Sequence, residues 1–450
     1  MDKILIAFCL IVGASASILV FPDGIVASAL ALIISGAVIL IIRSRTGTDA
    51  DYLVWLFIIA LLARIVFGLT IHVFQLREFF GGDAITYDSL GYRIVELWFG
   101  QASPDDFWSQ RATSLSNPGW GMNYLTGFIY LLVGRNILAA QTFCGVIGAA
   151  TVPLVYICAY RIFNNRRVGK ISALLVALYP AFIIWSGQLM KDGLIIFLLV
   201  LAMTMVLRLQ EKIDYVAIGI LIFSLFGILS LRFYIFYMAA AAAIGAFIIG
   251  HGKTSPQAIF RRLAVLVLLG IGLTYLGVLR NASAELDKYG SLENIQRSRQ
   301  NLAEAADSGF GDDLDVSTTE GALAALPIGI TYLMLAPFPW QISNLRQAIT
   351  LPEILLWWSS IPLIIIGIVY TVRNRLRPAI PILIFTIMLT LAYSIFQGNV
   401  GTVYRQRTQI QVFLFIFIGV GWTVIQERKE NEMALRKLRN RQLRNVTSRR

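Results

Sequence analysis

Residues 189–250 are LMKDGLIIFLLVLAMTMVLRLQEKIDYVAIGILIFSLFGILSLRFYIFYMAAAAAIGAFIIG, and this stretch decides the fold class. It contains three apolar segments, 189–207, 213–230 and 233–250, separated only by short polar breaks. A helix that crosses a bilayer needs roughly 20 mostly apolar residues, because the hydrocarbon layer is about 30 Å thick and tolerates no unpaired backbone groups. The stretch therefore predicts consecutive membrane-spanning α-helices.

The same pattern extends over the whole chain of 450 residues, of which 57% are hydrophobic and 14% charged. Soluble domains carry roughly one quarter charged residues, so this composition argues against a soluble fold. We predict an all-α fold, a polytopic transmembrane helical bundle of about 12 spans. The predicted spans lie near residues 3–21, 25–42, 53–75, 137–160, 168–185, 189–207, 213–230, 233–250, 260–279, 353–372, 379–396 and 408–425.

Basic residues are concentrated in alternate loops, which predicts that this side faces the cytoplasm. The alternation requires that two weaker apolar segments, 121–133 and 323–337, do not cross the membrane; prolines interrupt the second. The basic positions are Arg43, Arg45, Arg161, Arg166, Arg167, Lys170, Arg208, Lys212, Lys253, Arg261, Arg262, Arg373, Arg375, Arg377 and the C-terminal tail.

The formal net charge of +12 is carried in large part by the tail, residues 427–450, which directly follows a hydrophobic span. This position predicts a cytoplasmic anchor near anionic lipids and no nucleic-acid partner. We divide the chain into two N-terminal transmembrane helices (1–52), a main membrane domain (53–426) with outward loops 77–136 and 280–352, and the basic tail (427–450).

The first outward loop opens directly after a span with a glycine-rich turn and two carboxylates, Asp83 and Asp88. A carboxylate at the membrane surface is suited to act as a general base on an acceptor hydroxyl or amine. In the structural alternative, Gly82 and Asp83 form a turn that caps a helix running to about Phe99. The sequence leaves both interpretations open, and both aspartates are candidate catalytic residues.

Three further segments are predicted to open toward the same compartment. Arg405 and Arg407 precede the last span, where arginines run against the positive-inside rule, and their planar forks of donors suit phosphate oxygens. In the alternative interpretation, both arginines extend to lipid headgroups. The remaining candidates for substrate binding are Lys191, Asp192, Arg232 and Tyr234, each of which could instead be a helix cap or an interfacial anchor. Tyr87 of the first outward loop is a further candidate for substrate binding.

Other polar features carry weaker signals. Arg64 lies near the middle of a predicted span and should face a partner or a hydrated cavity. Trp340 is expected in an interfacial belt, with a sugar-stacking surface as the alternative. The acidic segment 311–315 lacks the ligand series of a calcium loop, and no nucleotide-binding or zinc-hydrolase motif occurs. We predict no metal site, and the sequence leaves a requirement for a divalent cation open.

These features resemble the GT-C superfamily of membrane glycosyltransferases, which includes protein O-mannosyltransferases and the lipid A aminoarabinose transferase. The similarity rests on Gly82-Asp83-Ala84 with Tyr87 just after a span, on residues 186–192, and on Arg232 with Tyr234. It covers about residues 53–250. The acidic loop follows the third predicted span, whereas in the superfamily it usually follows the first; two additional N-terminal helices would account for this.

The resemblance implies a reaction. A sugar linked through phosphate or pyrophosphate to a polyprenyl lipid is the donor, Asp83 or Asp88 activates the acceptor, and attack inverts the anomeric carbon. Arg405 and Arg407, with Lys191 or Arg232, would neutralise the leaving lipid phosphate. The acceptor remains open between glycan, lipid and protein.

Two other functions compete with this hypothesis. A polysaccharide polymerase or ligase of the O-antigen type would consume lipid-linked oligosaccharides, and a transporter or lipid flippase would line a path with Arg64 and the outward charges. In every case the predicted location is a bacterial inner membrane, with the site on the periplasmic or extracellular side. The transferase hypothesis places the protein in cell-envelope polysaccharide biosynthesis.

Overall fold

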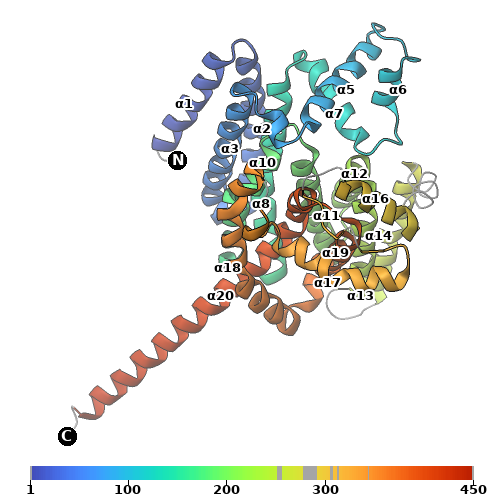
Figure 1. Cartoon of the computed structure of the whole chain (residues 1–450). Helices are drawn as coiled ribbons and strands as arrows, with labels where there is room; N and C mark the ends of the chain where they lie inside the picture. Colours follow the sequence, from blue (N-terminus) through green and yellow to red (C-terminus); the bar gives the residue numbers. More distant parts are fainter. Residues whose placement is uncertain are drawn as a thin grey trace.

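The computed structural model describes residues 3–250, 256–276, 291–304, 308–311, 314–342 and 344–447. Helices make up nearly all of this part of the chain, and none of it is assigned to a β-strand; a single isolated bridge pairs Gly309 with Asn399. The prediction of an all-α fold is therefore confirmed (Figure 1).

The helices follow one another in four groups. The first contains α1 (Lys3–Leu19), α2 (Asp23–Thr46), the 3-10 turn η1 (Gly47–Asp49) and α3 (Ala50–Val73). The second contains α4 (Arg77–Phe80), α5 (Asp83–Trp98), α6 (Phe107–Thr113) and α7 (Trp120–Val133). The third contains α8 (Ile137–Phe163), α9 (Arg166–Leu178), α10 (Pro180–Ser186), α11 (Lys191–Glu211), α12 (Tyr215–Leu231), α13 (Phe233–Ile249) and α14 (Pro256–Tyr275). The fourth contains α16 (Leu292–Glu304), α17 (Thr319–Leu335), η2 (Pro339–Gln341), α18 (Leu345–Asn374), α19 (Leu376–Phe396) and α20 (Val400–Thr447).

The centre of the bundle is formed by α8, α11 and the first half of α20. In their most apolar windows 72%, 78% and 83% of residues are buried, against 28% in α18. Helix α8 packs against α2, α3, α9 and α11, while α20 packs against α9 and α18. Small residues make this close approach possible: a Cβ on Gly419 of α20 would lie 2.9 Å from the carbonyl oxygen of Val168 in α9. The central helices are apolar on all sides because protein surrounds them.

Six helical stretches are long and apolar enough to cross a membrane, or seven if the bent pair α9–α10 is one span. One of the six is Asp23–Val73, which comprises α2 and α3. Four shorter apolar helices add to these: Ala7–Leu19, Tyr215–Leu231, Phe233–Ile249 and Thr319–Leu335. The membrane character is confirmed, but the predicted count of about 12 spans is not, because several predicted spans form helices shorter than roughly 20 residues.

The predicted span 168–185 is bent by 57° between α9 and α10. Pro180 starts α10, and Tyr179 before it adopts an extended conformation with φ −69° and ψ 126°. Proline lacks an N–H and disfavours helical geometry in the residue that precedes it, so the helix ends at Leu178. The last carbonyls of α9 are consequently free to accept other donors.

Arg64 of α3 uses these carbonyls. Its Nη1 donates to the carbonyl oxygens of Ala60 at 2.8 Å and Ala177 at 3.3 Å, and its Nε donates to Ser186 Oγ at 2.7 Å. The prediction that Arg64 has a partner is confirmed. These partners are carbonyls and a hydroxyl, so the contacts join α3 to the break between α9 and α10.

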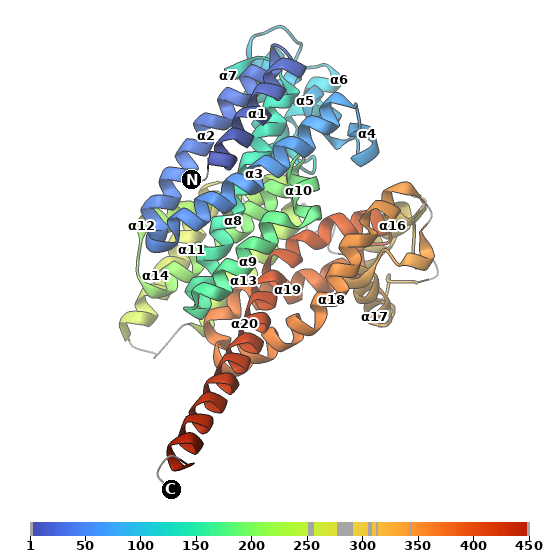
Figure 2. The same cartoon turned by 90° about the vertical axis from the view of Figure 1, so that its left-hand side faces the viewer.

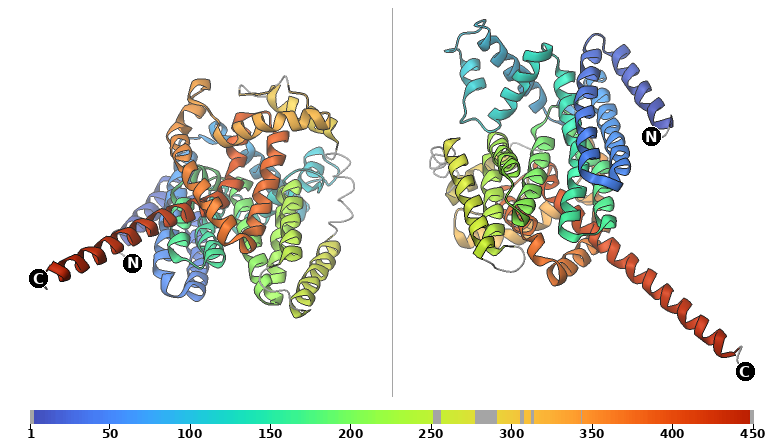
Figure 3. Two further views of the ribbon diagram at one scale, coloured as in Figure 1. Left: turned by 90° about the horizontal axis from the view of Figure 1, so that it is seen from below. Right: turned by 180° about the vertical axis from the view of Figure 1, so that it is seen from behind.

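The predicted basic loops meet at one end of the bundle, although Lys253 lies outside the described residues. Ion pairs there connect η1, α8, α9, α11 and α20, with nitrogen–oxygen distances between 2.7 and 3.4 Å: Asp49–Lys170, Asp49–Arg166, Arg161–Glu211 and Arg167–Glu430. Helix α20 continues past this end and projects away from the body in every view (Figures 2 and 3). The cytoplasmic location of this end stays a prediction.

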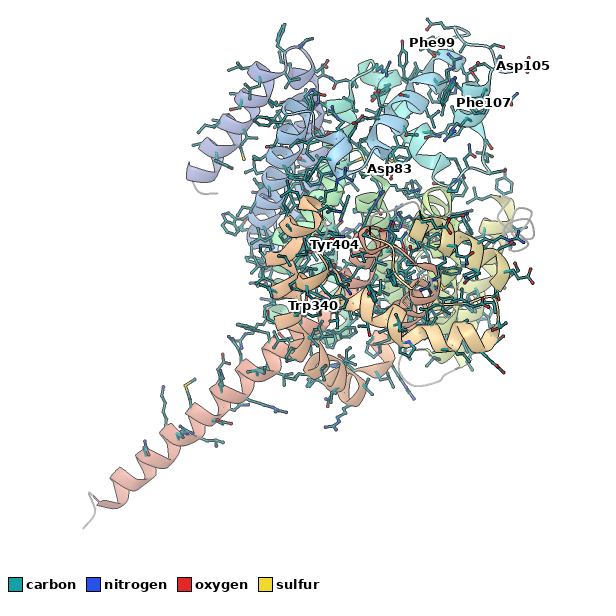
Figure 4. All side chains as sticks on the ribbon, viewed as in Figure 1. Asp83, Phe99, Asp105, Phe107, Trp340 and Tyr404 are labelled. Atoms are coloured by element: carbon teal, nitrogen blue, oxygen red, sulfur yellow. The ribbon has the colours of Figure 1, made fainter. Side chains whose placement is uncertain are left out.

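Helices α5, α6 and α7 form a unit at the opposite end (Figure 1). Helix α5 packs against α6 and α7, and α7 joins the unit to α8 and α12. In Figure 4, Phe99, Asp105 and Phe107 lie at the far end of this unit, whereas Asp83 lies where the unit meets the helices below. The first turn of α5 is thereby held against the body of the protein.

Candidate active site

Asp83 is the first residue of α5 and pairs with Arg405 of α20. Gly81, with φ +123°, makes the turn between α4 and α5. Gly82 occupies the N-cap position of α5, so no side chain caps this helix. The Asp83 carboxylate does not cap its own helix; its Oδ2 lies 2.8 Å from Arg405 Nη1. This pair joins residues 322 positions apart in sequence (83 and 405).

Asp192, the second residue of α11, lies on the buried side of the same guanidinium. Its Oδ2 accepts from Arg405 Nε at 2.6 Å, and its Oδ1 lies 3.1 Å from Arg232 Nη2. Arg232 occupies the extended link between α12 and α13. The Asp192 side chain is fully buried, so its two arginine partners compensate a charge that would otherwise be costly inside the protein.

Lys191 and Tyr87 lie close together beside Gly119, which has φ +86°, and they belong to the same group of side chains as Asp83, Asp192 and Arg405. A Cβ added there would lie 3.0 Å from Lys191 Nζ and 3.3 Å from Tyr87 Oη, so both polar tips reach the Gly119 backbone. Burial, together with the nearby Asp83 carboxylate, raises the pKa of the Tyr87 phenol. Tyr87 therefore stays a neutral hydroxyl at physiological pH.

We call Asp83, Tyr87, Lys191, Asp192, Arg232 and Arg405 the Asp83 cluster. It contains three cations and two carboxylates, and thus one excess positive charge, which suits an anionic ligand. Tyr234 and Tyr393 both lie within electrostatic range of Arg232, and their ring centroids are 6.1 Å apart. Tyr393 was not singled out from the sequence, since a tyrosine near the end of an apolar span is common.

A cavity of about 450 Å³ lies beside Arg405. Arg405 Nη2 is buried and has no hydrogen-bond partner among the described residues, and the guanidinium lies 5.5 Å from the centroid of the Trp185 ring. Arg346 also lines the cavity; it donates to the Glu78 carbonyl at 3.2 Å and lies over the Phe79 ring. The sequence analysis missed Arg346, although an arginine in the predicted outward loop 280–352 runs against the positive-inside rule as Arg405 does.

The cavity wall is mixed in character. Aromatic and aliphatic side chains alternate with amides and hydroxyls, an arrangement typical of pockets for ligands with an apolar and a polar part. The lining residues are Phe79, Phe80, Gly81, Ile184, Trp185, Ser308, Pro337, Asn344, Arg346, Gln347, Ile349, Thr350, Asn399, Val400, Gly401, Thr402, Tyr404 and Arg405.

Asp88, the second predicted catalytic carboxylate, is held elsewhere. Its Oδ1 accepts from Tyr130 Oη at 2.5 Å, and its Oδ2 lies 2.6 Å from Arg135 Nη2. Arg135 in turn lies over the Tyr92 ring at 4.7 Å. These contacts join α5 to α7 and to the start of α8, and the structure does not bring Asp88 to Arg405.

Arg407 is also separated from the Asp83 cluster. Its side chain is fully buried, and Nη1 donates to the carbonyl oxygens of Met334 at 3.2 Å and Ala336 at 2.8 Å. The rings of Trp357 and Tyr404 cover its guanidinium at 5.7 and 5.4 Å. These contacts connect α20 with α18 and the end of α17.

Two weaker predictions have partial outcomes. Trp340 is 74% exposed and stacks on Phe338 with ring centroids 5.2 Å apart; its place in an interfacial belt stays a prediction. In the acidic segment, Asp312 and Asp313 lie outside the described residues. Among the residues that the structure describes, no group of three histidine, cysteine, aspartate or glutamate side chains could hold a metal ion.

Sequence comparison supports the resemblance to membrane glycosyltransferases. The family model for dolichyl-phosphate-mannose-protein mannosyltransferase, a GT-C family, matches residues 114–231, which confirms the resemblance over this part of the chain. The matched region includes Lys191 and Asp192 and ends one residue before Arg232. Comparisons with curated proteins and with solved structures gave no match. The family match supports a membrane glycosyltransferase.

Proposed function

We propose that this protein transfers a single sugar from a polyprenyl-phosphate donor to an acceptor, with Asp83 as the general base. The observation that carries the proposal is the position of Asp83. It is a carboxylate with a 45% exposed side chain, and it is paired with an arginine that lines a cavity of about 450 Å³. A general base must be accessible to the acceptor or to solvent, and a bound phosphate must contact cations.

The donor's phosphate belongs on the Arg405 side of the cluster. Arg405 Nη2 supplies a buried donor without a partner in the described part of the chain, and the cluster carries one excess positive charge. The mixed wall of the cavity suits a sugar phosphate followed by the first part of an apolar chain. Arg405 would thus stabilise the negative charge that develops on the leaving phosphate.

The reaction then balances as a single displacement. The acceptor hydroxyl gives its proton to the Asp83 carboxylate, and its oxygen forms a bond to the anomeric carbon. The bond from that carbon to the phosphate oxygen breaks with the electron pair remaining on the oxygen, so polyprenyl phosphate leaves and the anomeric configuration inverts. Lys191 and Tyr87, which meet at Gly119, would orient the sugar hydroxyls.

We assign this end of the bundle to the extracytoplasmic side. The assignment is supported by the ion-paired basic loops at the other end, because basic loops are enriched on the cytoplasmic side. In a bacterial inner membrane the acceptor would then be a periplasmic glycan, lipid or protein of the cell envelope.

The test compares Asp83→Asn with Asp88→Asn in purified protein in liposomes. Transfer of radiolabelled mannose from polyprenyl-phosphate mannose to a cell-envelope acceptor fraction would be measured, followed by donors that carry other single sugars. Loss of a general base should lower the rate by about 10²- to 10⁴-fold in Asp83→Asn. Asp88→Asn removes the same charge from the same helix and should retain most of the activity.

Three results would contradict the proposal. Full transfer by Asp83→Asn would exclude the base. Elongation of lipid-linked oligosaccharides without use of single-sugar donors would favour a polymerase. Movement of a solute or lipid across the liposome membrane without any transfer would favour a transporter.

A further inference from the structure

The three nitrogens of the Arg405 guanidinium have unequal surroundings. Nε donates to Asp192 Oδ2 at 2.6 Å, Nη1 lies 2.8 Å from Asp83 Oδ2, and Nη2 is buried without a partner in the described part of the chain. In a planar guanidinium, Nη2 forms one edge with Nε and the other edge with Nη1. Each edge therefore contains one nitrogen that is paired with a carboxylate.

A phosphate bound by a guanidinium prefers two parallel hydrogen bonds from one edge. At Arg405, a phosphate that takes Nη2 must share an edge with Asp192 or with Asp83. Two anions at one edge repel each other, and the repulsion is strong where water is scarce. One of the two carboxylates must give way.

The two carboxylates differ in how firmly they are held. Asp192 is fully buried and has a second ion pair with Arg232, so its withdrawal would leave a buried charge uncompensated. The Asp83 side chain is 45% exposed, and Arg405 is its single ion-pair partner among the residues that the structure describes. Asp83 moves into water at lower cost, so the edge formed by Nη1 and Nη2 is the one that becomes available.

We infer that the donor's phosphate displaces Asp83 from Arg405 and thereby frees the base. This inference rests on the proposed function and adds a binding order: without donor, the Asp83 carboxylate is held in an ion pair with Arg405. With donor bound, the carboxylate is released at the moment when a leaving group is present. Donor binding therefore precedes proton abstraction from the acceptor.

Competition for one guanidinium is reciprocal, because a coupling free energy acts equally on both ligands. If Asp83 opposes the phosphate, removal of its charge must tighten phosphate binding. We therefore expect the Asp83→Asn variant to transfer sugar poorly and yet to bind the lipid phosphate more tightly than the unchanged protein does. A carboxylate that merely helps to form the pocket would weaken binding when replaced.

The experiment measures binding of a fluorescent polyprenyl phosphate to the full-length protein in phosphatidylcholine vesicles, which carry no net anionic headgroup. Asp83→Asn should bind about tenfold more tightly, in the usual range for coupled sites. Asp88→Asn, the matched charge removal on α5, should show no gain. Arg405→Gln should lose most of the affinity, because the donors of the guanidinium are absent.

Controls assign the gain to the phosphate of the lipid. Polyprenol, which lacks the phosphate, should bind the Asp83→Asn variant and the unchanged protein equally. An equal gain with polyprenol, or a gain with inorganic phosphate but not with polyprenyl phosphate, would overturn the inference. Unchanged or weaker binding in Asp83→Asn would overturn it as well.

The inference and the proposed function fail separately. If Asp83→Asn abolishes transfer but leaves lipid-phosphate binding unchanged, the transferase survives and the displacement of Asp83 is wrong. If the unchanged protein transfers no sugar but Asp83→Asn binds polyprenyl phosphate more tightly, the competition at Arg405 is correct and the proposed reaction is wrong.

Discussion

Arg405 and Arg407 lie two positions apart in α20, yet they occupy two different regions of the molecule. Arg405 contacts two carboxylates and lines the cavity beside Trp185. Arg407 is fully buried against the carbonyls of Met334 and Ala336. Two helical positions correspond to a rotation of about 200°, so the two side chains leave opposite faces of the helix.

An unpaired hydrogen-bond donor is therefore not sufficient evidence for a bound ligand. Both guanidinium groups have nitrogens without a partner among the described residues. The Arg407 guanidinium lies over two rings, those of Trp357 and Tyr404, whereas the Arg405 guanidinium lies over one ring, that of Trp185, and Arg405 also lines a cavity. We therefore assign a structural role to the Arg407 region and ligand binding to the Arg405 region.

The largest expected effect is on stability, in Arg407→Met. The variant leaves two carbonyls without their donor and leaves the buried carboxylate of Glu353 without the nearby positive charge. Breaking a buried charge arrangement from one side costs about 3–5 kcal/mol. Reversible unfolding in mixed detergent micelles would measure this loss.

Arg405→Met is the matched control for that experiment. Asp192 keeps Arg232 as an ion-pair partner when Arg405 is removed, so the loss of stability should be clearly smaller. Equal losses in the two variants would mean that Arg405 is as structural as Arg407, and the distinction between the two regions would fail.

The next effect concerns transfer activity in Arg405→Lys and Arg405→Ala. Removal of a group that stabilises developing negative charge typically costs about 10²- to 10³-fold in rate, equivalent to roughly 2.7–4 kcal/mol. Lysine retains the charge but not the planar fork, so Arg405→Lys should recover only part of the activity. Initial rates at saturating donor, corrected for the folded fraction, would measure both.

If Arg407→Met, corrected in the same way, lost as much activity as Arg405→Ala, the two arginines would not differ in role. We expect Arg407→Met protein that remains folded to transfer sugar at nearly the original rate. This result would show that the two faces of α20 act independently.

The sequence identified the segments of the site but not its pairs. The positive-inside rule singled out both Arg405 and Arg407. It could not separate them, because it counts charges and takes no account of the helix face that carries them. The pair of Asp192 with Arg405 joins positions 213 apart, and no periodicity within one helix predicts such a contact. Helical spacing does explain the outcome for Asp83 and Asp88, whose five-residue separation turns them about 140° apart.

The all-α membrane fold was predictable from the composition of the chain, whereas the number and the ends of the spans were less predictable. Apolar runs identified the long apolar helices of the bundle, but not α4, α5, α6 and α16. Pro180 divided one predicted span, and α20 extended far beyond another. The cavity was not predictable, since it forms where α4, α10, α18 and α20 meet and no pattern within one segment predicts these contacts.

The smallest expected effect is at the Asp88 region, in Arg135→Ala. The pair of Arg135 with Asp88 is partly open to solvent, with Arg135 47% exposed, and such pairs contribute at most about 1 kcal/mol. Tyr130 still donates to the carboxylate in the variant, so Asp88 stays in place. We expect a stability change near the limit of measurement and an unchanged transfer rate.

The Arg135→Ala variant also provides an independent test of which aspartate, Asp83 or Asp88, is the catalytic base. Arg135 and Arg405 each pair with one carboxylate of α5, but only Arg405 lines the cavity described above. A loss of transfer above tenfold in Arg135→Ala, with the protein still folded, would require a chemical role for Asp88 and would move the base away from Asp83. An unchanged transfer rate in Arg135→Ala, together with a loss of transfer in Arg405→Ala, would assign catalysis to Asp83. The catalytic carboxylate would then be the one whose arginine partner lines the cavity.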